Sequence, residues 1–512
     1  MPKRYLCAFA IAAGLCLLLN LALARVQAAE ACSQLMGNRQ PNVTINAATA
    51  VAPGGFAPAS ASSPAAKQTF ASLTGFCRVQ ATLTPSPDSD ITIEVWMPAD
   101  GWNGRFQAVG GRALGGVIVY PAMASALAAG YVTASTDTGH VGPGGAFADG
   151  HPEKVIDHGE RAVHAMTLAA KRLIAQFYGR AAEQSYFNGC SLGGRQGLAE
   201  AQRYPQDYDG IIAGDIANDI TGLYAARLAQ HQFAHRSVEA VLTEGALRTL
   251  NRGAVSACDD LDGVRDGVIG NPQQCRFDPA VLACDAAGGS PTDCLNAEQV
   301  ETARRLYAPV THPDNGRLVS NGLMPGSEAG WQAVIGPEPE RNSVEVYRHM
   351  VFKNPQWDWH GFDLRTALAA ARTSQLNAVD ATNPDLRAFF GRGGKLLMTH
   401  GWADPQTPPM NGLEYFTRVR STVGVQADGS LRLFMVPGMG HCDGGVGTDV
   451  FDPMVPLTAW VERGTAPLRL DARRVVDGRV VRTRPLCPYP QMARWNGSGG
   501  TDLAASFTCA AP

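Results

Sequence analysis

The sequence predicts an α/β protein built on a mostly parallel sheet with helices on both faces. Strand-like and helical segments alternate through residues 29–220 and again through residues 386–512, an order typical of such sheets. A glycine-rich turn joins one predicted strand directly to a helix. Residues 221–385 interrupt the alternation, so we expect them to form an inserted domain, a lid over the carboxyl ends of the strands.

The individual elements follow from the periodicity of apolar residues. Period-two alternation and short apolar runs predict strands at residues 91–96, 105–109, 131–136, 185–187, 210–214, 395–399 and 431–436. Helical spacing predicts helices at residues 160–178 and 192–204. Residues 47–66 are rich in Ala, Ser, Pro and Gly, and are predicted to be a loop.

Composition limits the classes of protein that the chain can belong to. Of 512 residues, 45% are hydrophobic, which suits a globular protein and excludes a disordered one. The 43 Lys and Arg residues nearly balance the 46 Asp and Glu residues. Because the net charge is only −3 and no long run has one sign, a nucleic-acid partner is not expected.

The N-terminus has the order of a secretory signal peptide. Lys3 and Arg4 precede an apolar run over residues 6–23 and a small-residue stretch over residues 26–29. We expect cleavage after Ala28, which makes residues 1–28 a signal peptide and the protein secreted or periplasmic. The alternative is an uncleaved membrane anchor. No second apolar stretch of about 18 residues occurs, so the mature protein is expected to be soluble.

Ten cysteines follow this segment, and an even number in an exported chain predicts disulfide bonds. Zinc is the alternative, but the chain has no Cys-x-x-Cys pair. Connectivity does not follow from sequence alone. Pairing near neighbours is the natural guess, namely Cys32 with Cys77, Cys258 with Cys275, Cys284 with Cys294 and Cys487 with Cys509. Cys190 and Cys442 then remain.

A candidate nucleophile lies in the glycine-rich turn. Residues 188–194 contain Gly-x-Ser-x-Gly centred on Ser191. The pattern is short enough to arise by chance, but a strand before it and a helix after it are the context that a nucleophilic serine requires. Flanking glycines permit the strained backbone, and the N–H of Leu192 would face a developing oxyanion.

A serine hydroxyl needs a base and an orienting carboxylate. In hydrolases with this turn, the chain order is serine, acid, histidine. Asp404 and His441 follow the last two predicted strands in that order. The alternative for each is an ordinary loop residue. Four other histidines are rivals: His140, His158, His164 and His400. Of these, His400 is the alternative base because it ends a predicted strand.

Cys190 precedes the candidate nucleophile and Cys442 follows the candidate base. A bond between them would join the serine and histidine loops across the site. Its long loop would constrain the unfolded chain by about 4–5 kcal/mol in the loop-entropy model. The alternative is that a free Cys190 is itself the nucleophile, but an exported protein favours the oxidised form.

These residues resemble the tannase and feruloyl esterase family. The resemblance rests on Cys190-Ser191, on Asp404 within residues 400–405, on His441-Cys442, and on the segments 101–106, 135–140 and 208–214. The family includes tannases, feruloyl and chlorogenate esterases and mono(2-hydroxyethyl) terephthalate hydrolase. The resemblance implies an α/β-hydrolase core with an inserted lid, catalytic Ser191, Asp404 and His441, and five disulfides paired as above, with Cys190 bonded to Cys442.

The loop that should supply the second oxyanion N–H departs from the family pattern. Residues 110–116 read Gly-Gly-Arg-Ala-Leu-Gly-Gly, where the family usually has Gly-Asn-Gly-Gly-Phe-Ala-Gly. We choose Gly111 as the donor, with Gly110 and Arg112 as rivals. Because a backbone donor tolerates a changed side chain, the departure does not argue against the activity.

An acidic loop between Cys258 and Cys275 is a candidate calcium site. Closely spaced carboxylates on a turn-rich loop suit Ca²⁺, although the spacing is not that of an EF-hand. The alternative is a solvated surface loop, since Asp-Gly pairs are common turn formers. The family resemblance implies a structural Ca²⁺ within the lid, held by Asp259, Asp262 and Asp266 and by the carbonyls of Val264 and Val268.

The expected activity is hydrolysis of a carboxylic ester through an acyl-enzyme. The family implies an aromatic acyl group of the feruloyl, galloyl or terephthaloyl type. One alternative is a mono(2-hydroxyethyl) terephthalate hydrolase-like esterase; others are acyl transfer to another acceptor and a non-catalytic binding protein. Lid aromatics are candidate pocket walls, although scattered aromatics are more often core: Trp331, Tyr347, Phe352, Trp357, Trp359 and Phe362.

Overall fold

The computed structural model describes residues 27–284, 293–372 and 374–512. Residues 1–26 of the predicted signal peptide therefore lie outside the described residues. The described residues form two compact units. The first contains the chain up to Val109 with Gly116–Val141 and Ala162–Tyr186, and the second contains Gly110–Gly115, Gly142–Arg161 and Phe187–Pro512. The predicted boundary between core and lid at residues 221–385 is not tested by this division and stays a prediction.

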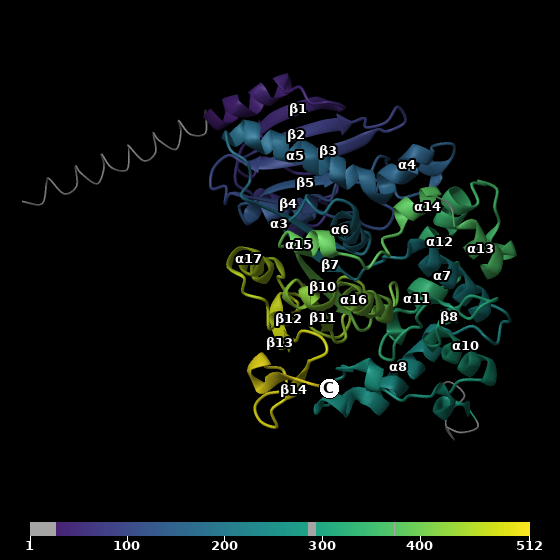
Figure 1. Cartoon of the computed structure of the whole chain (residues 1–512). Helices are drawn as coiled ribbons and strands as arrows, with labels where there is room; N and C mark the ends of the chain where they lie inside the picture. The colour runs from purple at the N-terminus through teal and green to yellow at the C-terminus, as the bar shows by residue number, and fades with distance from the viewer. Residues whose placement is uncertain (1–26, 285–292, 373) are drawn as a thin grey trace, which may run out of the picture. The chain divides into compact units, whose positions relative to one another are not determined.

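The first unit carries strands in the order β1-β2-β3-β5-β4. Neighbours from β1 to β5 are antiparallel, whereas β4 and β5 are parallel. Helices α3 and α5 pack on β5 (Figure 1). The bounds are β1 Val43–Val51, β2 Phe76–Leu83, β3 Ile91–Pro98, β4 Arg105–Val109, β5 Val132–Thr136, α2 Pro64–Ala71, α3 Tyr120–Ala128 and α5 Ala162–Tyr178.

The prediction of a loop over residues 47–66 is wrong at both ends, because residues 47–51 belong to β1 and residues 64–66 to α2. No residue of β1 is buried, so its sequence lacks the apolar alternation of a strand with one face in the core. Three alanines, which have low β propensity, also weaken the pattern. The strand is held instead by antiparallel pairing with β2 at the edge of the sheet.

The second unit carries the parallel strands. Strand β6 begins in the first unit and ends in the second, where the order continues β6-β7-β10-β11. Strands β7, β10 and β11 pair in parallel and are buried over nearly their whole length, which explains their continuous apolar runs. The bounds are β6 Gln184–Cys190, β7 Gly210–Gly214, β10 Lys395–Gly401 and β11 Leu431–Val436.

Three helices of the second unit pack on these strands. Helix α6 (Leu192–Arg203) contacts β7, α16 (Pro409–Val423) contacts β10, and α17 (Met454–Arg463) contacts both strands. The predicted strands and helices of this part of the chain are therefore present, with β6 extending three residues beyond the predicted end, to Cys190. The carboxyl ends of β6, β10 and β11 lead into the segments that carry Ser191, Asp404 and His441.

A largely helical region joins β7 to β10 (Figure 1). Its two larger apolar clusters lie around Tyr347 and around Trp331, and a smaller one contains Cys258, Ile269 and Cys275. Of the six candidate wall aromatics, two are buried in the first cluster, three are partly buried and pack against it, and one is buried in the second, so these side chains are mainly core; they are Tyr347 and Phe362, then Phe352, Trp357 and Trp359, and finally Trp331. The bounds are α7 Ile220–Ala234, α8 Glu244–Cys258, α10 Ala297–Tyr307, β8 Val310–Thr311, β9 Leu318–Ser320, α11 Gln332–Ile335, α12 Arg341–Glu345, α13 Leu364–Ala370, α14 Ser374–Val379 and α15 Arg387–Gly391.

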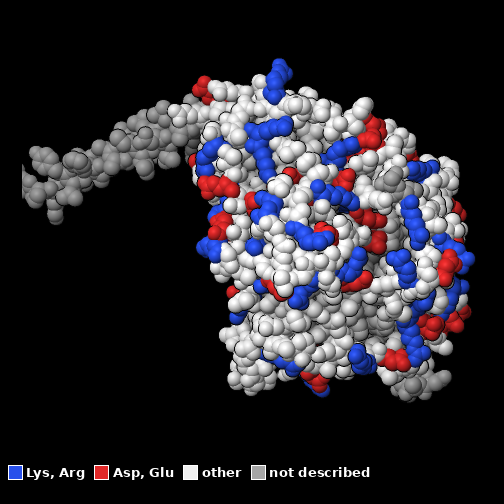
Figure 2. All heavy atoms as spheres, viewed as in Figure 1, with Lys and Arg blue, Asp and Glu red and all other residues white. Residues whose placement is uncertain are grey.

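Two hairpin-like pairs complete the second unit, β12 (Leu470–Val476) with β13 (Arg479–Leu486) and β14 (Met492–Trp495) with β15 (Phe507–Ala510). Acidic and basic side chains are interspersed on the face shown in Figure 2. Within the described ranges, we find no helix with the length and apolar character needed to cross a bilayer.

Candidate active site

Ser191 lies at the sharp turn between β6 and α6. Its backbone has φ 62° and ψ −120°, a region that residues with a side chain rarely adopt. The Ser191 N–H donates to the carbonyl oxygen of Gly214, 3.0 Å away at the end of β7. This conformation is that of a strand-to-helix turn that presents a serine hydroxyl above the sheet.

The glycines of this turn are required by close backbone contacts. A Cβ atom on Gly189 would lie 2.5 Å from the carbonyl carbon of Gly193, and one on Gly110 would lie 2.5 Å from the Gly193 Cα. A Cβ atom on Gly194 would collide with the carbonyl oxygen of Gly214. The loop after β4, the turn and the end of β7 can therefore approach one another only because these positions lack side chains.

Asp404 and His441 are brought together by the loops after β10 and β11. The Nδ1 atom of His441 lies 2.7 Å from Oδ2 of Asp404. The other carboxylate oxygen accepts the N–H groups of Gln406 and Thr407 at 2.7 and 3.0 Å, and the Thr407 hydroxyl donates to Oδ2. Asp404 is fully buried, so these contacts fix the carboxylate that faces the imidazole.

The charges and hydrogen bonds around Asp404 and His441 favour the ionised carboxylate and raise the pKa of the imidazole. Burial alone would raise the pKa of Asp404, but the charge of His441 and hydrogen bonds from His400 and His441 hold it well below its ordinary value. Burial would likewise lower the pKa of His441, but the charge and hydrogen bond of Asp404, with a smaller effect of Asp215, raise it. The arrangement suits an imidazole that accepts a proton beside a permanent carboxylate.

A disulfide joins the serine and histidine loops. Cys190 bonds to Cys442, with 6.0 Å between their Cα atoms and 252 positions between them in the chain. Since Ser191 follows one cysteine and His441 precedes the other, their Cα atoms lie within about 14 Å. The structure thus brings all three predicted triad residues to one end of the parallel strands.

A second layer of buried polar groups lies behind Asp404. His400 Nε2 lies 2.8 Å from the Thr407 carbonyl oxygen and 3.5 Å from Asp404 Oδ2. Asp215, at the end of β7, accepts the N–H of Gly401 at 2.9 Å, and burial raises its pKa to about 7. His400 is only 1% exposed, so this predicted alternative base instead supports the carboxylate from behind.

The candidate oxyanion donors differ in whether their backbone N–H groups already donate a hydrogen bond. Leu192 is the first residue of α6, where N–H groups lack partners within the helix. The Gly111 N–H, our choice for the second donor, already donates to Gln196 Oε1 at 2.8 Å, and the Gly110 N–H donates to Asn188 at 2.9 Å. Among the described residues, the Arg112 N–H makes no hydrogen bond, so of these three loop residues Arg112 has the N–H that is not already donated.

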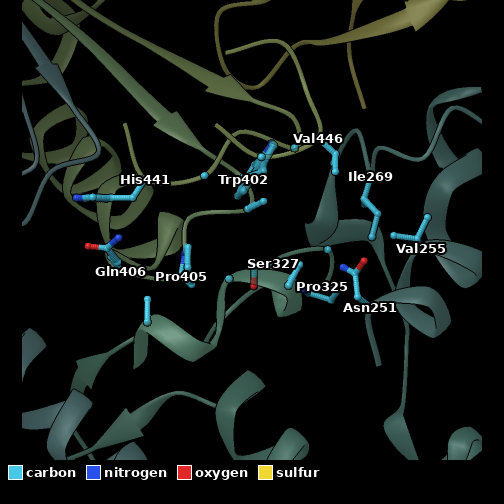
Figure 3. A pocket seen from close by; sticks show the side chains of 18 of the residues that line it. Asn251, Val255, Ile269, Pro325, Ser327, Trp402, Pro405, Gln406, His441 and Val446 are labelled. Carbon is cyan, nitrogen blue, oxygen red and sulfur yellow. The ribbon is translucent and has the colours of Figure 1, made fainter. Parts of the chain in front are cut away.

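A pocket of about 460 Å³ adjoins His441 (Figure 3). One wall comes from α8, the acidic loop and residues 325–333, and the other from the loops after β10 and β11. Its lining is mainly apolar, with a few hydrogen-bonding side chains and no Lys or Arg. The polar lining residues are Asn251, Ser327, Gln406, His441 and Asp443.

The acidic loop has a donor set that fits a hard cation in part. Asp259 Oδ1 accepts the N–H groups of residues 266–268. Burial, with a smaller effect of the neighbouring carboxylates of Asp266 and Asp259, raises the pKa of Asp262 to about 6. Asp262, Asp266 and Val268 line a cavity of about 20 Å³, room for one small species. However, the same cavity is lined by Arg482 and Arg484, and Arg484 is paired with Asp266.

The other four disulfides follow the near-neighbour pairing, namely Cys32 with Cys77, Cys258 with Cys275, Cys284 with Cys294 and Cys487 with Cys509. Of the other rival histidines, His140 and His158 are buried. His158 lies in the segment Asp157–Arg161 that precedes α5 in the chain.

Four polar residues at the site were missed by the sequence analysis: Asp215, Gln196, Arg227 and Thr407. Asp215 had a detectable signal, because it directly follows a predicted parallel strand. Thr407 also had a signal, since an aspartate side chain often accepts the backbone N–H groups of the residues that follow it, as Asp404 does here. Gln196 and Arg227 lie inside helices, where nothing in the sequence marks them.

Comparison with known proteins finds a family and relatives that match most of the chain. A family model described as tannase and feruloyl esterase matches residues 77–510. The mono(2-hydroxyethyl) terephthalate hydrolase of Piscinibacter sakaiensis is 33% identical, with 94% of this chain and 92% of that one covered. A probable feruloyl esterase B of Aspergillus clavatus is 32% identical, with 85% and 86% covered.

Solved structures give the same picture of the fold. The crystal structure of feruloyl esterase B from Aspergillus oryzae matches with a TM-score of 0.87 at 28% identity, covering 94% of this chain and 100% of that one. The tannin acyl hydrolase from Aspergillus niger matches with a TM-score of 0.76 at 22% identity, covering 95% of each chain, which supports the fold alone. The predicted α/β-hydrolase type of fold is thus confirmed.

Proposed function

Because the chain belongs to the tannase and feruloyl esterase family, whose members are carboxylic ester hydrolases, we propose that it hydrolyses aromatic esters through a serine acyl-enzyme. The observation that carries this proposal is the 2.7 Å contact between His441 Nδ1 and Asp404 Oδ2. That contact leaves Nε2 of His441 for a proton from Ser191, and the Cys190–Cys442 bond holds the two loops together.

The chemistry follows from these positions. His441 Nε2 takes the Ser191 proton as Oγ bonds to the ester carbonyl carbon, and Asp404 stabilises the imidazolium. The tetrahedral intermediate collapses, the bond to the alcohol oxygen breaks, and His441 protonates the departing alcohol. Water then gives a proton to His441 as its oxygen bonds to the acyl carbon. The bond from that carbon to Ser191 Oγ breaks, His441 returns the proton to Oγ, and the acid is released.

The oxyanion of each tetrahedral intermediate would be held by two backbone N–H groups. We assign these to Leu192 and Arg112, because the Gly111 N–H is occupied by Gln196. Gln196 then holds the 110–112 loop in place rather than binding the substrate. Donors fixed in this way need no reorganisation during the reaction.

The lining of the pocket beside His441 suits a substrate group that is aromatic and uncharged. An apolar lining with a few hydrogen-bonding groups suits a phenolic ring. A carboxylate such as that of a terephthalate monoester would meet no cation among the lining residues, and would lie near Asp443. We therefore favour hydroxycinnamoyl or galloyl esters over mono(2-hydroxyethyl) terephthalate.

Two further features are part of the proposal. Ca²⁺ would be held by the carboxylates of Asp259, Asp262 and Asp266 with the carbonyls of Val264 and Val268, where it would neutralise buried acids and fix the loop without entering the reaction. Export is supported by the leader-like residues 1–28 and by the five disulfides, which persist in oxidising compartments.

The test compares initial rates of the wild-type protein and Ser191→Ala on methyl ferulate, methyl gallate, chlorogenate, mono(2-hydroxyethyl) terephthalate and a short aliphatic ester. We expect cleavage of at least one phenolic ester, and loss of that cleavage in Ser191→Ala. Ser72→Ala, which removes an exposed helix-end hydroxyl, is the control and should keep the wild-type rate.

The same panel contains the results that would overturn the proposal. Cleavage of the terephthalate ester alone would assign the alternative substrate. A new ester product after addition of an alcohol acceptor would indicate acyl transfer. Wild-type inactivity on every ester, with binding of one detected by calorimetry, would reassign the fold to binding.

A further inference from the structure

A buried arginine contacts the loop that carries the candidate catalytic acid. Arg227 lies on α7 and is 1% exposed. Its Nη2 atom donates to the carbonyl oxygens of Pro405, at 2.5 Å, and of Gln406. These two residues directly follow Asp404, so one side chain of the inserted region anchors the turn in which Asp404 lies.

The other side of the guanidinium faces a second acid. Glu340, the residue before α12, has Oε2 4.0 Å from Arg227 Nε, and the Ser343 hydroxyl donates to it at 3.3 Å. Among the described residues, Nε and Nη1 of Arg227 make no hydrogen bond. Arg227 is therefore a desolvated charge whose field is weakly screened by water.

His441 experiences the field of this pair together with that of its other charged neighbours. Arg227 lowers the pKa of His441, a smaller effect than the rise caused by Asp404. Glu340 and His441 also interact, and each favours the charged form of the other. The groups to be considered around His441 are Asp404, Asp215, His400, Arg227, Glu340 and the adjacent Asp443.

We propose that Arg227 and Glu340 form a positioning pair for the catalytic base. Arg227 fixes the Asp404 turn through two backbone carbonyls, and the opposite charges of the pair set the pH above which His441 can accept the Ser191 proton. The inference rests on the proposed roles of Ser191, Asp404 and His441. Neither residue of the pair is assigned contact with the substrate.

The pairing explains why the arginine is tolerated in the interior. A single buried cation is costly unless it is compensated. Here Glu340 and Asp404 supply negative charge on either side, while the carbonyls of Pro405 and Gln406 accept hydrogen bonds. Asp404, Asp215 and Glu340 each favour the protonated form of His441, and the positive charge of Arg227 offsets part of this effect.

The test measures kcat/KM against pH for the wild type, Arg227→Met and Glu340→Gln. The acidic limb reports the protonation of His441, because only the neutral imidazole accepts a proton. Removing the nearby cation should raise the pKa of His441 and move the limb to higher pH by about 0.5 unit or more. Removing the nearby anion should move it to lower pH.

Two further variants separate charge from position. Arg227→Lys keeps the charge but cannot donate to two carbonyls from one planar group, so kcat should fall while the limb stays near that of the wild type. The double variant Arg227→Met with Glu340→Gln leaves no unpaired charge, and its limb should lie between those of the single variants. The double variant also tests the pair if one of the single variants fails to fold.

The exposed pair of Arg236 and Glu298, 2.6 Å apart at the end of α7, provides matched controls. Arg236→Met and Glu298→Gln should leave the limb where the wild type has it. If both buried variants move the limb in one direction, or neither moves it, the pair does not set the pH dependence and the proposal fails.

An NMR titration of the His441 imidazole in the same variants needs no turnover. It therefore distinguishes failure of this inference from failure of the proposed function. Opposite shifts of the imidazole in an inactive protein would support the pair and overturn the esterase mechanism. Activity that depends on Ser191, without opposite shifts of the His441 imidazole, would support the esterase mechanism and overturn the pair.

Discussion

Asp404 has more polar partners than its proposed role as an orienting acid needs. Its two oxygens interact with the N–H groups of Gln406 and Thr407, with the Thr407 hydroxyl and with His441. Arg227 holds the backbone of the same turn from the other side. A carboxylate fixed in this way is oriented before the substrate binds, and preorganised groups of this kind are an effective source of transition-state stabilisation.

The assignment of Arg112 as an oxyanion donor predicts different effects for two substitutions of one residue. Arg112→Ala keeps the backbone N–H and should leave kcat close to that of the wild type. Arg112→Pro removes the N–H and should lower kcat by about 10²–10³-fold. The check is kcat on the best phenolic ester. A large loss in Arg112→Ala, or none in Arg112→Pro, would return the assignment to Gly111 or another donor.

The residues of the candidate triad could be predicted from the sequence, whereas the helix residues Arg227 and Gln196 that contact the loops of the site could not. Ser191, Asp404 and His441 each follow a strand in the order that the chemistry requires. Arg227 contacts a carbonyl 178 positions away, and only the folded chain brings the two together. Gly111 was chosen without knowledge of Gln196, whose side chain occupies the same N–H.

The turn between β6 and α6 depends on glycine for space. Gly194 approaches the end of β7 so closely that a methyl group would meet the Gly214 carbonyl oxygen. That oxygen also accepts the Ser191 N–H, so a displacement there would move the backbone of the candidate nucleophile. This element therefore couples the stability of the sheet to the position of Ser191.

Gly194→Ala should consequently lower both stability and activity. We expect a loss of about 1–3 kcal/mol in the free energy of unfolding, as for other overpacked sites, together with a reduced kcat. Denaturant unfolding and initial rates measure the two effects. Gly429→Ala is the control, because no atom lies within 4 Å of its added methyl group. Wild-type stability in Gly194→Ala would show that the turn can relax.

Buried parallel strands were the easiest elements to predict. Strands β7, β10 and β11 are short apolar runs because both of their faces are covered. Strand β1 was missed because none of its residues is buried. The hairpin of β12 and β13 was also missed, since its outer residues are exposed valines and arginines, which carry little periodicity.

At the scale of the whole molecule, the proposed Ca²⁺ predicts a concentration-dependent melting temperature. A cation that binds only the folded chain adds about 2.7 kcal/mol when present at about 100 times its Kd. Scanning calorimetry with CaCl₂ or with EDTA measures this gain. Asp262→Asn should abolish it, whereas Asp260→Asn should keep it, because Asp260 is exposed and paired with Arg265. Equal melting temperatures with CaCl₂ and with EDTA would contradict the site.

The bond between Cys190 and Cys442 closes a covalent ring that contains the candidate acid and the whole helical region between β7 and β10. A single backbone cut anywhere inside that ring leaves one connected molecule rather than two pieces. A nicked protein should therefore run as one chain on a denaturing gel without reductant and as two with it. Ser191 and His441 would remain tethered after the cut, so protease damage to the helical region between β7 and β10 need not end activity.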